Sequence, residues 1–428
     1  MTPSRSALSG LLALPGLVLA PGAALATDGA HAAQARPHPA CHGQPATIVG
    51  TPGWDRLVGT QGRDVIVGLG GDDVILGLGG DDVLCGNVGA DTLRGGAGDD
   101  ELYGGLAHRW IDRGGVSFTP NILVGGEGDD LLDIGRDDRW VDESYDVSAG
   151  RIDYGSAAQG VQVDLRAGTA TGAGTDRIVP RKYLAVHGSP YDDVLAGGPR
   201  GDQLIGADGD DVITGRSGDD YLDPEDWQSD DPPGGDDHVD GGPGTDLITS
   251  WGGADDLRGG DGPDTISAHS TEPALVRGGA GVDHLTVPVP SAPGFLVDGG
   301  PGLDTLRLTY PFGDFDPEDP AVYTLVMEDG TLSRDDEVIG GVHDIGGLIA
   351  LEGRRQWVYH GTDAVDLVQG YFARGLRAWT YGGDDVVEGT PARDRLDVGE
   401  GHDEVDGGNS RDVCVGAEVR RRCEVVRP

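Results

Sequence analysis

The sequence predicts an all-β protein in which short strands stack into a solenoid built from nine-residue repeats. Three observations support this prediction. Glycine and aspartate recur with a period of nine residues, a large aliphatic residue occupies one fixed place in each unit, and aromatic residues make up only 5% of the 428 residues. A chain with 77 glycines and so few aromatic residues is poorly suited to a large conventional core. A stack of repeats needs only a thin core, because each unit packs on its neighbours.

The chain is strongly acidic. It contains 74 Asp and Glu residues against 31 Lys and Arg residues, which gives a formal net charge of −43. We therefore expect no nucleic acid among its partners, because phosphate binding requires clustered basic side chains. This composition is typical either of a disordered acidic chain or of a repeat protein in which Gly and Asp follow a period. The nine-residue period favours the second class.

The N-terminus has the features of a secretory signal peptide. Arg5 precedes an apolar run, and Ala24-Leu25-Ala26 supplies the small residues of a cleavage site. We expect residues 1–26 to be removed, the mature chain to begin near Thr27, and residues 27–49 to form a short N-terminal segment. A disordered Ala-rich leader is the alternative. No later stretch has the roughly 20 apolar residues of a transmembrane helix, so the sequence predicts a secreted, extracellular protein without a transmembrane segment.

The first repeat block covers residues 50–133. Six units in succession have Gly at positions 1 and 4, Asp at position 6 and Leu or Ile at position 8, and one isolated unit follows. Glycine at positions 1 and 4 permits the positive φ of a tight turn. The last three residues of each unit form a short strand whose middle, aliphatic side chain points inward. The position-6 residues of this block are Asp55, Asp64, Asp73, Asp82, Asp91, Asp100 and Asp130.

The same pattern returns in two later blocks. Residues 188–309 form the second repeat block, and residues 380–428 form a C-terminal block with a cap. The position-6 residues of the second block are Asp193, Asp202, Asp211, Asp220, Asp237, Asp246, Asp255, Asp264, Asp283 and Asp304. Those of the C-terminal block are Asp385, Asp394, Asp403 and Asp412.

The repeated unit has the pattern G-G-x-G-x-D-x-U-x, where U is a large aliphatic residue. This pattern resembles the haemolysin-type (RTX) calcium-binding nonapeptide repeat of secreted bacterial proteins. The resemblance covers most of the chain after the signal peptide. It implies a parallel β-roll, a solenoid related to the β-helix, in which two nonapeptides make one turn. It also implies several bound Ca²⁺ ions as the cofactor.

The position-6 aspartates are the candidate calcium ligands. With 18 residues per turn, aspartates two repeats apart lie on the same edge, so Asp82 is expected between Asp64 and Asp100, whereas Asp130 is expected to stand alone. Two facing carboxylates repel each other without a cation. Together with turn carbonyls they form an oxygen-rich site that suits Ca²⁺, with its six to eight ligands, better than Mg²⁺. The alternative is that these aspartates only stabilise turns.

Two segments separate the blocks. Residues 134–187 resemble the connecting unit that commonly joins RTX blocks, and the period-two alternation of aliphatic residues from Val161 to Leu165 predicts a strand with one buried face. Residues 310–379 keep the repeat register only around Asp366. We expect further strands of the same stack, or a small β insert, in this second segment.

The four cysteines of an exported chain indicate disulfides. We expect the bridges Cys41–Cys85 and Cys414–Cys423. Each would hold a terminal segment over an exposed end of the stack, where unpaired strand edges invite association. Four free buried thiols are the alternative.

The sequence predicts a secreted calcium-binding protein that folds on binding Ca²⁺ and is not an enzyme. A structural, adhesive or surface-associated role would follow, with a partner outside the cell or on its surface. The alternative is a secreted hydrolase or toxin-like protein with a small active site in 310–379 and the repeats as its calcium-dependent scaffold. The acidic and histidine residues of that segment include Asp314, Glu318, Glu328, His343 and His360. Their spacing matches no mechanism that we can name.

Overall fold

The computed structural model describes residues 38–112, 115–135, 150–181, 183–225, 235–270, 272, 274–289, 293–309, 321–353, 355–371 and 373–427. Every regular element in these ranges is a β-strand, which confirms the all-β prediction. None of the described segments forms a helix that is long and apolar enough to cross a membrane. The expected signal peptide, 1–26, and the expected mature N-terminus at Thr27 lie outside the described residues.

The strands form two sheets that face each other across one core. The first sheet is parallel throughout. Its strands, in spatial order, are β4 (Arg56–Val58), β6 (Val74–Gly79), β8 (Thr92–Ala97), β12 (Asn121–Glu127), β14 (Gly150–Asp153), β18 (Ala185–His187), β20 (Gln203–Ile205), β22 (Tyr221–Asp223), β24 (Leu247–Ser250), β26 (Thr265–Ala268), β28 (His284–Pro288), β30 (Thr305–Thr309), β34 (Leu348–Leu351), β36 (Leu367–Gly370), β38 (Val386–Glu388), β40 (Glu404–Asp406) and β42 (Val419–Arg421).

The second sheet is parallel except at two places. Its strands, in spatial order, are β3 (Ile48–Val49), β5 (Val65–Gly70), β7 (Val83–Val88), β9 (Glu101–Leu106), β13 (Leu131–Asp133), β17 (Thr175–Ile178), β16 (Thr169–Thr171), β15 (Gln162–Asp164), β19 (Val194–Ala196), β21 (Val212–Thr214), β23 (His238–Pro243), β25 (Asp256–Asp261), β27 (Leu275–Ala280), β29 (Phe295–Asp298), β33 (Glu337–His343), β32 (Thr331–Arg334), β31 (Val322–Val326), β35 (Gln356–His360), β37 (Gly375–Trp379), β39 (Arg395–Asp397), β41 (Val413–Val415) and β43 (Val425–Arg427).

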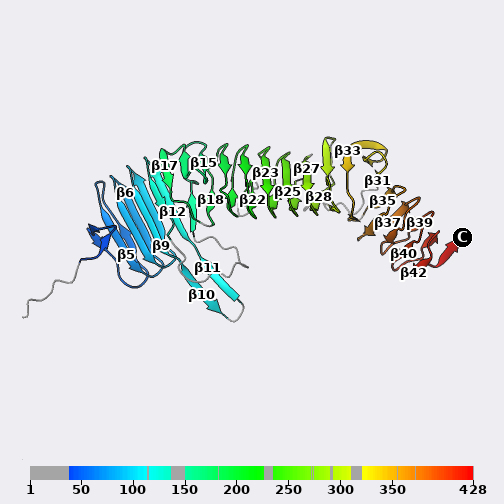
Figure 1. Cartoon of the computed structure of the whole chain (residues 1–428), viewed down its shortest axis with the longest axis horizontal. Helices are drawn as coiled ribbons and strands as arrows, with labels where there is room; N and C mark the ends of the chain where they lie inside the picture. Colours follow the sequence, from blue (N-terminus) through cyan, green and yellow to red (C-terminus); the bar gives the residue numbers. More distant parts are fainter. Residues whose placement is uncertain are drawn as a thin grey trace, which may run out of the picture. The chain divides into compact units, whose positions relative to one another are not determined.

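Two hairpins lie outside these sheets. β1 (Ala40–Cys41) pairs with β2 (Gln44–Pro45), and β10 (His108–Asp112) pairs with β11 (Gly115–Thr119). The β10–β11 hairpin projects from the stack at the coil between β9 and β12 (Figure 1). It inserts extra residues into a coil without breaking the pairing of the strands on either side of it, because β8 still pairs with β12.

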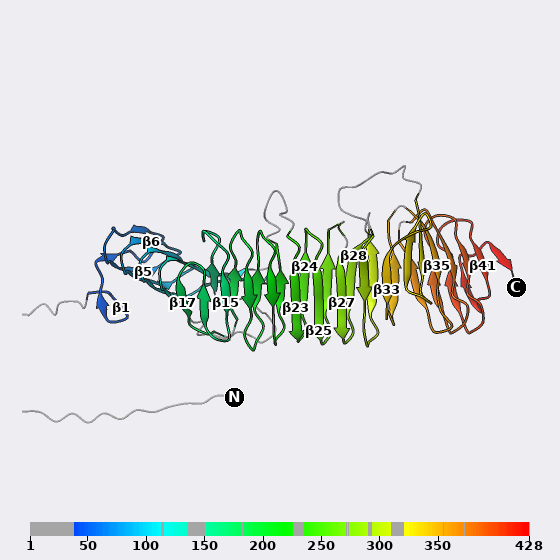
Figure 2. The same cartoon turned by 90° about the horizontal axis from the view of Figure 1, so that it is seen from above.

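The repeat period sets the coil. Val65 of β5 pairs with Val83 of β7, which in turn pairs with Glu101 of β9, so one turn contains 18 residues. Successive strands therefore alternate between the two sheets, and strands of one sheet lie side by side along the stack (Figures 1 and 2). Two nonapeptides per turn were expected from the resemblance, and the pairing confirms the parallel β-roll.

The core is a double row of position-8 side chains. In the first block five of these residues in succession are fully buried, Ile66, Ile75, Leu84, Leu93 and Leu102, and Leu57 in the first repeat is partly buried. The flanking residues of each strand point away from this row, as alternation along a strand requires. Burying one Leu or Ile contributes about 1.5–3 kcal/mol, so each repeat depends on its neighbours for stability.

The connecting unit adds strands to the second sheet. β15, β16 and β17 form an antiparallel meander that separates β13 from β19. Val161, Val163 and Leu165 are buried in the main core, so the predicted strand with one buried face is confirmed. The meander is joined to the roll by Arg216, whose guanidinium donates two hydrogen bonds to the carboxylate of Asp164, at 2.8 and 2.9 Å.

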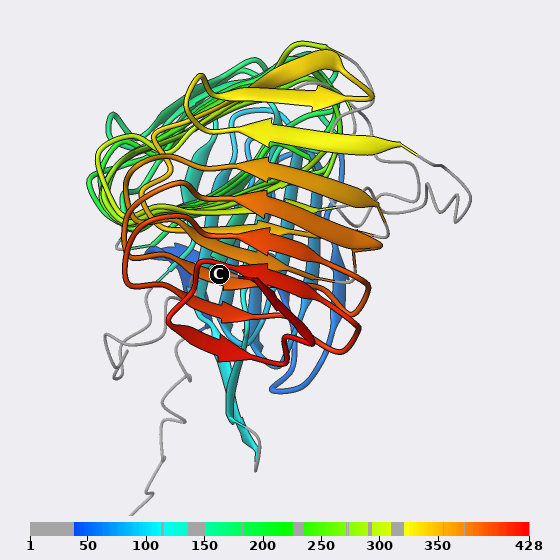
Figure 3. The same ribbon diagram turned by 90° about the vertical axis from the view of Figure 1, so that its right-hand side faces the viewer.

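Residues 321–379 repeat this arrangement. β31, β32 and β33 form a second antiparallel meander, between β29 and β35 of the same sheet. β34 to β37 then continue both parallel ladders. Both alternatives raised for this segment are thus present, a β insert and further strands of the stack. The last coils, orange and red in Figure 3, stack on one another.

The N-terminal disulfide joins Cys41 to Cys85, as predicted, but it does not lie over the open end of the stack. Cys85 is at position 9 of its repeat and points outward. With Val65, Val67 and Val83 it forms a small core on the outer face of β5 and β7, separate from the main one. The bridge therefore holds the β1–β2 hairpin against the flank of the roll, which corrects the capping expectation at this end.

The C-terminal disulfide joins Cys414 to Cys423, also as predicted. Cys414 is on β41 and is fully buried in the main core. Cys423 packs against that core from the segment between β42 and β43. This bridge therefore links β41 to the segment after β42 within the last coil.

Candidate calcium sites

The position-6 aspartates form a ladder along each edge of the roll. All of them except Asp55 are buried, with at most 7% of each residue exposed. In most of them one carboxylate oxygen accepts a hydrogen bond from the backbone of the coil before it: the N–H of Asp64 donates to Oδ1 of Asp82 at 2.7 Å, and the N–H of Asp82 donates to Oδ1 of Asp100 at 2.8 Å. Asp82 therefore lies between Asp64 and Asp100, as the 18-residue turn predicts.

The ladder continues through the connecting unit. Asp130 is not isolated, because its Oδ1 accepts the N–H of Asp100 at 2.9 Å and its own N–H donates to Oδ1 of Asp176 at 3.2 Å. The expectation that Asp130 stands alone is wrong, since β12 still pairs with β8 and β13 pairs with β17 despite the residues inserted between them. On the other edge, Oδ1 of Asn121 accepts the N–H of Asp91 at 2.9 Å.

Sequence reasoning missed three members of the ladder. They are Asn121, Asp176 and Glu418, whose side chain accepts the N–H of Asp403 at 2.8 Å. A signal for the first two was present. Each lies two residues before a buried aliphatic residue, the same spacing that joins positions 6 and 8 in the repeats.

The second carboxylate oxygen divides the ladder into two classes. In the larger class Oδ2 is buried and has no hydrogen-bond partner among the described residues. We call these the open aspartates. They are Asp73, Asp82, Asp91, Asp100, Asp130, Asp211, Asp220, Asp237, Asp246, Asp264, Asp283, Asp304, Asp385, Asp403 and Asp412.

In the smaller class the chain itself satisfies Oδ2. We call these the closed aspartates. In six of them the backbone N–H of the position-2 residue donates to Oδ2, at 2.5–2.9 Å, and in the seventh, Asp255, the Ser250 hydroxyl donates to it. The six are Asp55, Asp64, Asp193, Asp202, Asp366 and Asp394.

The backbone at position 2 separates the two classes. For every open aspartate whose position-2 residue is described, that residue has a positive φ, between 65° and 120°. For the six closed aspartates it does not. Positive φ is unusual for a residue with a side chain, yet Leu69 and Leu78 adopt it, at 82° and 83°. The turn around the carboxylate thus has two discrete forms.

Open carboxylates with a glycine at position 1 lie beside further oxygen atoms, as at Asp283. The place that a Cβ on Gly278 would occupy lies 2.5 Å from Oδ2 of Asp283 and 2.6 Å from the carbonyl oxygen of Gly299 in the next coil. Glycine at position 1 therefore leaves room for both oxygens. Carboxylate and carbonyl oxygens are the ligands that Ca²⁺ prefers, so these residues fit the ion.

Electrostatics also favour a cation in the open turns. Burial raises the pKa of Asp100, Asp130 and Asp246 to about 7, and neighbouring carboxylates add to the rise. For Asp211 burial raises the pKa to about 9. A buried carboxylate that is charged at neutral pH requires a compensating charge, and a calcium ion at Oδ2 would supply it.

A second ladder of aspartates lies at position 5. It was not predicted, although Asp-Asp pairs recur in the sequence. The N–H of Ala90 donates to Oδ1 of Asp72 at 2.9 Å, and the N–H of Asp99 donates to Oδ1 of Asp81 at 3.2 Å. These bonds run in the opposite direction to those of position 6, so the two ladders together tie each coil to both of its neighbours.

Of the residues named for the alternative active site, the two described histidines, His343 and His360, do not lie on neighbouring strands. Asp314 and Glu318 lie outside the described residues. His343 is on β33 and His360 is on β35, and two strands, β32 and β31, separate them in the sheet. His360 stacks on Trp379, and its Nδ1 lies 2.8 Å from the Tyr381 hydroxyl. His360 therefore packs against side chains of the neighbouring coil, whereas His343 is exposed.

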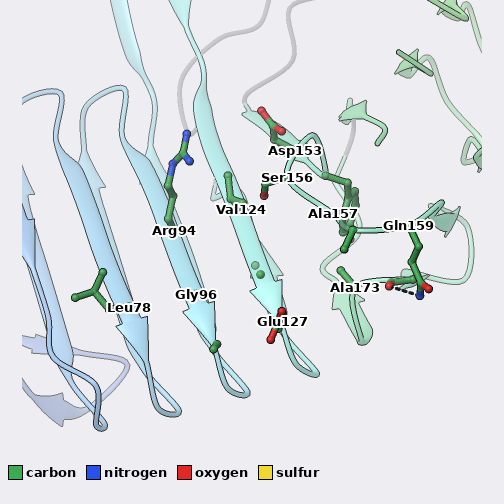
Figure 4. Close-up of a pocket in the computed structure, with 16 residues that line it drawn as sticks. Leu78, Arg94, Gly96, Val124, Glu127, Asp153, Ser156, Ala157, Gln159 and Ala173 are labelled. Carbon is green, nitrogen blue, oxygen red and sulfur yellow. Dashed lines mark hydrogen bonds between the residues drawn. The ribbon is translucent and has the colours of Figure 1, made fainter. Parts of the chain in front are cut away.

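A cavity of about 640 Å³ lies on the outer face of β6, β8 and β12, opposite the loop that contains Ser156 and Gln159 (Figure 4). Gly96 and other small residues form much of its wall, with Arg94 and Glu127 among the charged groups. None of the open or closed aspartates lines it. This hollow is thus separate from the aspartate ladder.

Comparison with known families agrees with this geometry. Five segments match the family described as RTX calcium-binding nonapeptide repeat (4 copies): residues 49–84, 86–108, 187–222, 234–266 and 379–414. The comparison with curated proteins found no match. The matched segments carry most of the aspartate ladder and the coils that it connects. These five segments therefore carry RTX calcium-binding nonapeptide repeats, and the chain that contains them folds as a parallel β-roll.

Proposed function

We propose that this protein is an exported calcium-dependent β-roll that acts outside the cell in a structural, adhesive or surface-associated role, without an enzymatic activity of its own. The observation that carries the proposal is the row of open aspartates, which repeats along nearly the whole stack. A fold that buries so many unpartnered carboxylate oxygens is unfavourable without a cation. Calcium binding and folding are thus one event.

The open aspartates are the proposed calcium ligands. Each contributes Oδ2, and the carbonyl oxygen at position 1 of the following coil, as at Gly299 beside Asp283, contributes a further oxygen. The six closed aspartates whose Oδ2 accepts a position-2 N–H are proposed to cap turns without an ion, because their own backbone already occupies Oδ2. This assignment removes Asp55, Asp64, Asp193, Asp202 and Asp394 from the ligand set that the sequence alone suggests.

Export is the proposed location. The N-terminal pattern of the sequence and the two disulfides both fit an oxidising compartment outside the cytosol. Calcium at millimolar concentration outside the cell would then fold the chain after export. A chain that stays unfolded until it meets this calcium is suited to a role at the cell surface or beyond it.

Circular dichroism and calcium titration of the purified mature chain test the proposal. We expect a disordered spectrum in chelator and a β-rich spectrum in millimolar Ca²⁺, with Mg²⁺ a poor substitute. A panel of hydrolase substrates separates this function from the alternative of an enzyme. Turnover that is lost on changing His343 or His360, with the fold retained, would favour the enzyme.

A further inference from the structure

We propose that Glu225, Asp237 and Asp255 form a cation site that the nine-residue period does not predict. One carboxylate oxygen of each lies within 4.8 Å of the corresponding oxygens of the other two. All three residues are buried, with at most 3% of each exposed. The repeat motif supplies Asp237 and Asp255, whereas Glu225 belongs to no position-6 column.

Glu225 lies where the regular repeat is interrupted. Pro224 occupies the place of a position-1 glycine. The carbonyl oxygen of Gly206, a position-1 residue, faces Gly188 in the preceding coil, and the carbonyl oxygen of Pro224 faces Gly206 in the same way. Glu225 therefore takes position 2 of this repeat. Its carboxylate turns toward the next coil in the stack and accepts the backbone N–H groups of Trp251 and Gly252, at 3.0 and 2.8 Å. These two bonds hold the third carboxylate in place.

The cluster contains an unpartnered oxygen. Oδ1 of Asp237 accepts the N–H of Asp211 at 2.7 Å, but its Oδ2 is buried without a hydrogen-bond partner. Asp255 is held from two sides, since its Oδ1 accepts the N–H of Asp237 at 3.0 Å and its Oδ2 accepts the Ser250 hydroxyl. The carboxylates of Glu225 and Asp255 are thus fixed in position by hydrogen bonds, and Asp237 keeps one buried carboxylate oxygen without a partner.

The charged groups around the cluster do not neutralise it. Among the described residues, those that act most strongly on these three carboxylates are one another and Asp210, Asp236 and Glu272, all acidic. Three buried carboxylates that have no basic partner among the described residues favour a bound cation when they are charged. The site is therefore built for a positively charged ligand.

Its chemistry selects a hard divalent cation of the size of Ca²⁺. Two oxygens bound to one Ca²⁺ at 2.3–2.6 Å are separated by up to about 5 Å, which accommodates the spacing here, whereas the shorter bonds of Mg²⁺ limit this separation to about 4 Å. Affinity rises with the number of charged ligands and with rigidity. We expect this site to fill at a lower calcium concentration than the open aspartates. The bound ion would hold the segment that follows β22 against the segments that precede β23 and β25.

The inference rests on a folded roll, and hence on the proposed calcium-dependent fold. Its test is equilibrium dialysis of the full chain against Ca²⁺, with circular dichroism at each concentration. Glu225→Gln should abolish the tightest binding phase and lower the stoichiometry by one ion, with the β-rich spectrum in saturating Ca²⁺ retained. Glu272→Gln is the matched control, because it removes an exposed carboxylate that acts on Asp255 from outside the cluster. Glu225→Gln with native stoichiometry and native tight binding would overturn the proposal.

A second measurement needs no variant. Anomalous diffraction from crystals of the native protein grown with a lanthanide should place an ion among Glu225, Asp237 and Asp255. Ions at the periodic turns but none within this cluster would overturn the site even if Glu225→Gln does not fold. A native chain that is already folded in chelator would instead contradict the proposed function, and the dialysis would still measure whether this site binds.

Discussion

Tyr381 and Thr390 both occupy position 2, in neighbouring repeats, and their backbones differ. Tyr381 has a φ of 65°, and the aspartate of its repeat, Asp385, is open. The N–H of Thr390 donates to Oδ2 of Asp394 at 2.6 Å, so that aspartate is closed. Pro391 follows Thr390, and a residue before proline prefers extended backbone. One backbone torsion therefore decides whether a position-6 carboxylate can receive an ion.

Asparagine substitutions should separate these two roles. Asp246→Asn keeps an acceptor for the N–H of Asp220 and removes the negative charge at the unpartnered Oδ2, so we expect fewer bound calcium ions. In Asp193→Asn the amide NH₂ must face either the N–H of Ser189 or that of Val161. We expect this variant to keep the native ion stoichiometry and to lose about 1–3 kcal/mol of unfolding free energy in saturating Ca²⁺. Isothermal titration and thermal unfolding measure both quantities, and equal ion loss in the two variants would contradict the assignment.

At the level of the elements, the hydrogen bonds of the aspartate ladder continue across segments that are inserted between strands. The β10–β11 hairpin and the β15–β17 meander both leave the register intact, and the N–H of Asp100 still meets Oδ1 of Asp130. The meander supplies Asp176 as the next member. A break in the nine-residue pattern of the sequence therefore does not break the row of ladder residues.

We expect Asp82→Ala and Asp130→Ala to impair calcium binding to a similar degree. Each aspartate is open, and each is flanked by a ladder member on both sides, Asp64 and Asp100 for the first and Asp100 and Asp176 for the second. Calcium stoichiometry measured by equilibrium dialysis checks this. A native stoichiometry for Asp130→Ala together with a reduced one for Asp82→Ala would show that the connecting unit ends the row of sites.

The period of nine was sufficient to predict the strands, the inward row from Ile66 to Leu102 and the 18-residue turn, because each depends on spacing alone. It was insufficient for Asp130 and Asp176, whose neighbours come from beyond inserted segments. The period also could not distinguish open from closed aspartates. Leu78 precedes an open aspartate and has a positive φ, although a leucine ordinarily prefers a negative φ. Ser or Thr followed by Pro at positions 2 and 3 was a usable signal for several closed turns.

The whole molecule should couple calcium to protons. Burial raises the pKa of open aspartates such as Asp100 and Asp246 to about 7, above the value of 3.8 that they have when unfolded. The calcium-free roll thus binds more protons than the unfolded chain between these pH values, so its stability is greatest below about pH 4 and falls as the pH rises through about 7. Calcium must displace these protons. We expect apparent calcium affinity to increase between pH 6 and pH 8, with proton release in calorimetry, and a pH-independent affinity would contradict this coupling.

Folding of the roll as a whole should follow calcium cooperatively. In chelator the chain has a net charge of −43 and a thin core, and it must order glycine-rich backbone at about 1–2 kcal/mol per residue. Each site that binds only the folded form adds about 2.7 kcal/mol when free calcium is a hundredfold above its dissociation constant. Because neighbouring coils share the ladder bonds, one filled turn orders the next, and binding should proceed with a steep titration curve.

The disulfides at Cys41–Cys85 and Cys414–Cys423 retain local structure near the ends, so the central strands β24 to β28 are the proper place to measure. Hydrogen exchange there should be fast in chelator and slow in millimolar Ca²⁺. Equal protection of these strands in both conditions would mean that the roll folds without its ions and that the aspartate ladder serves only the turns.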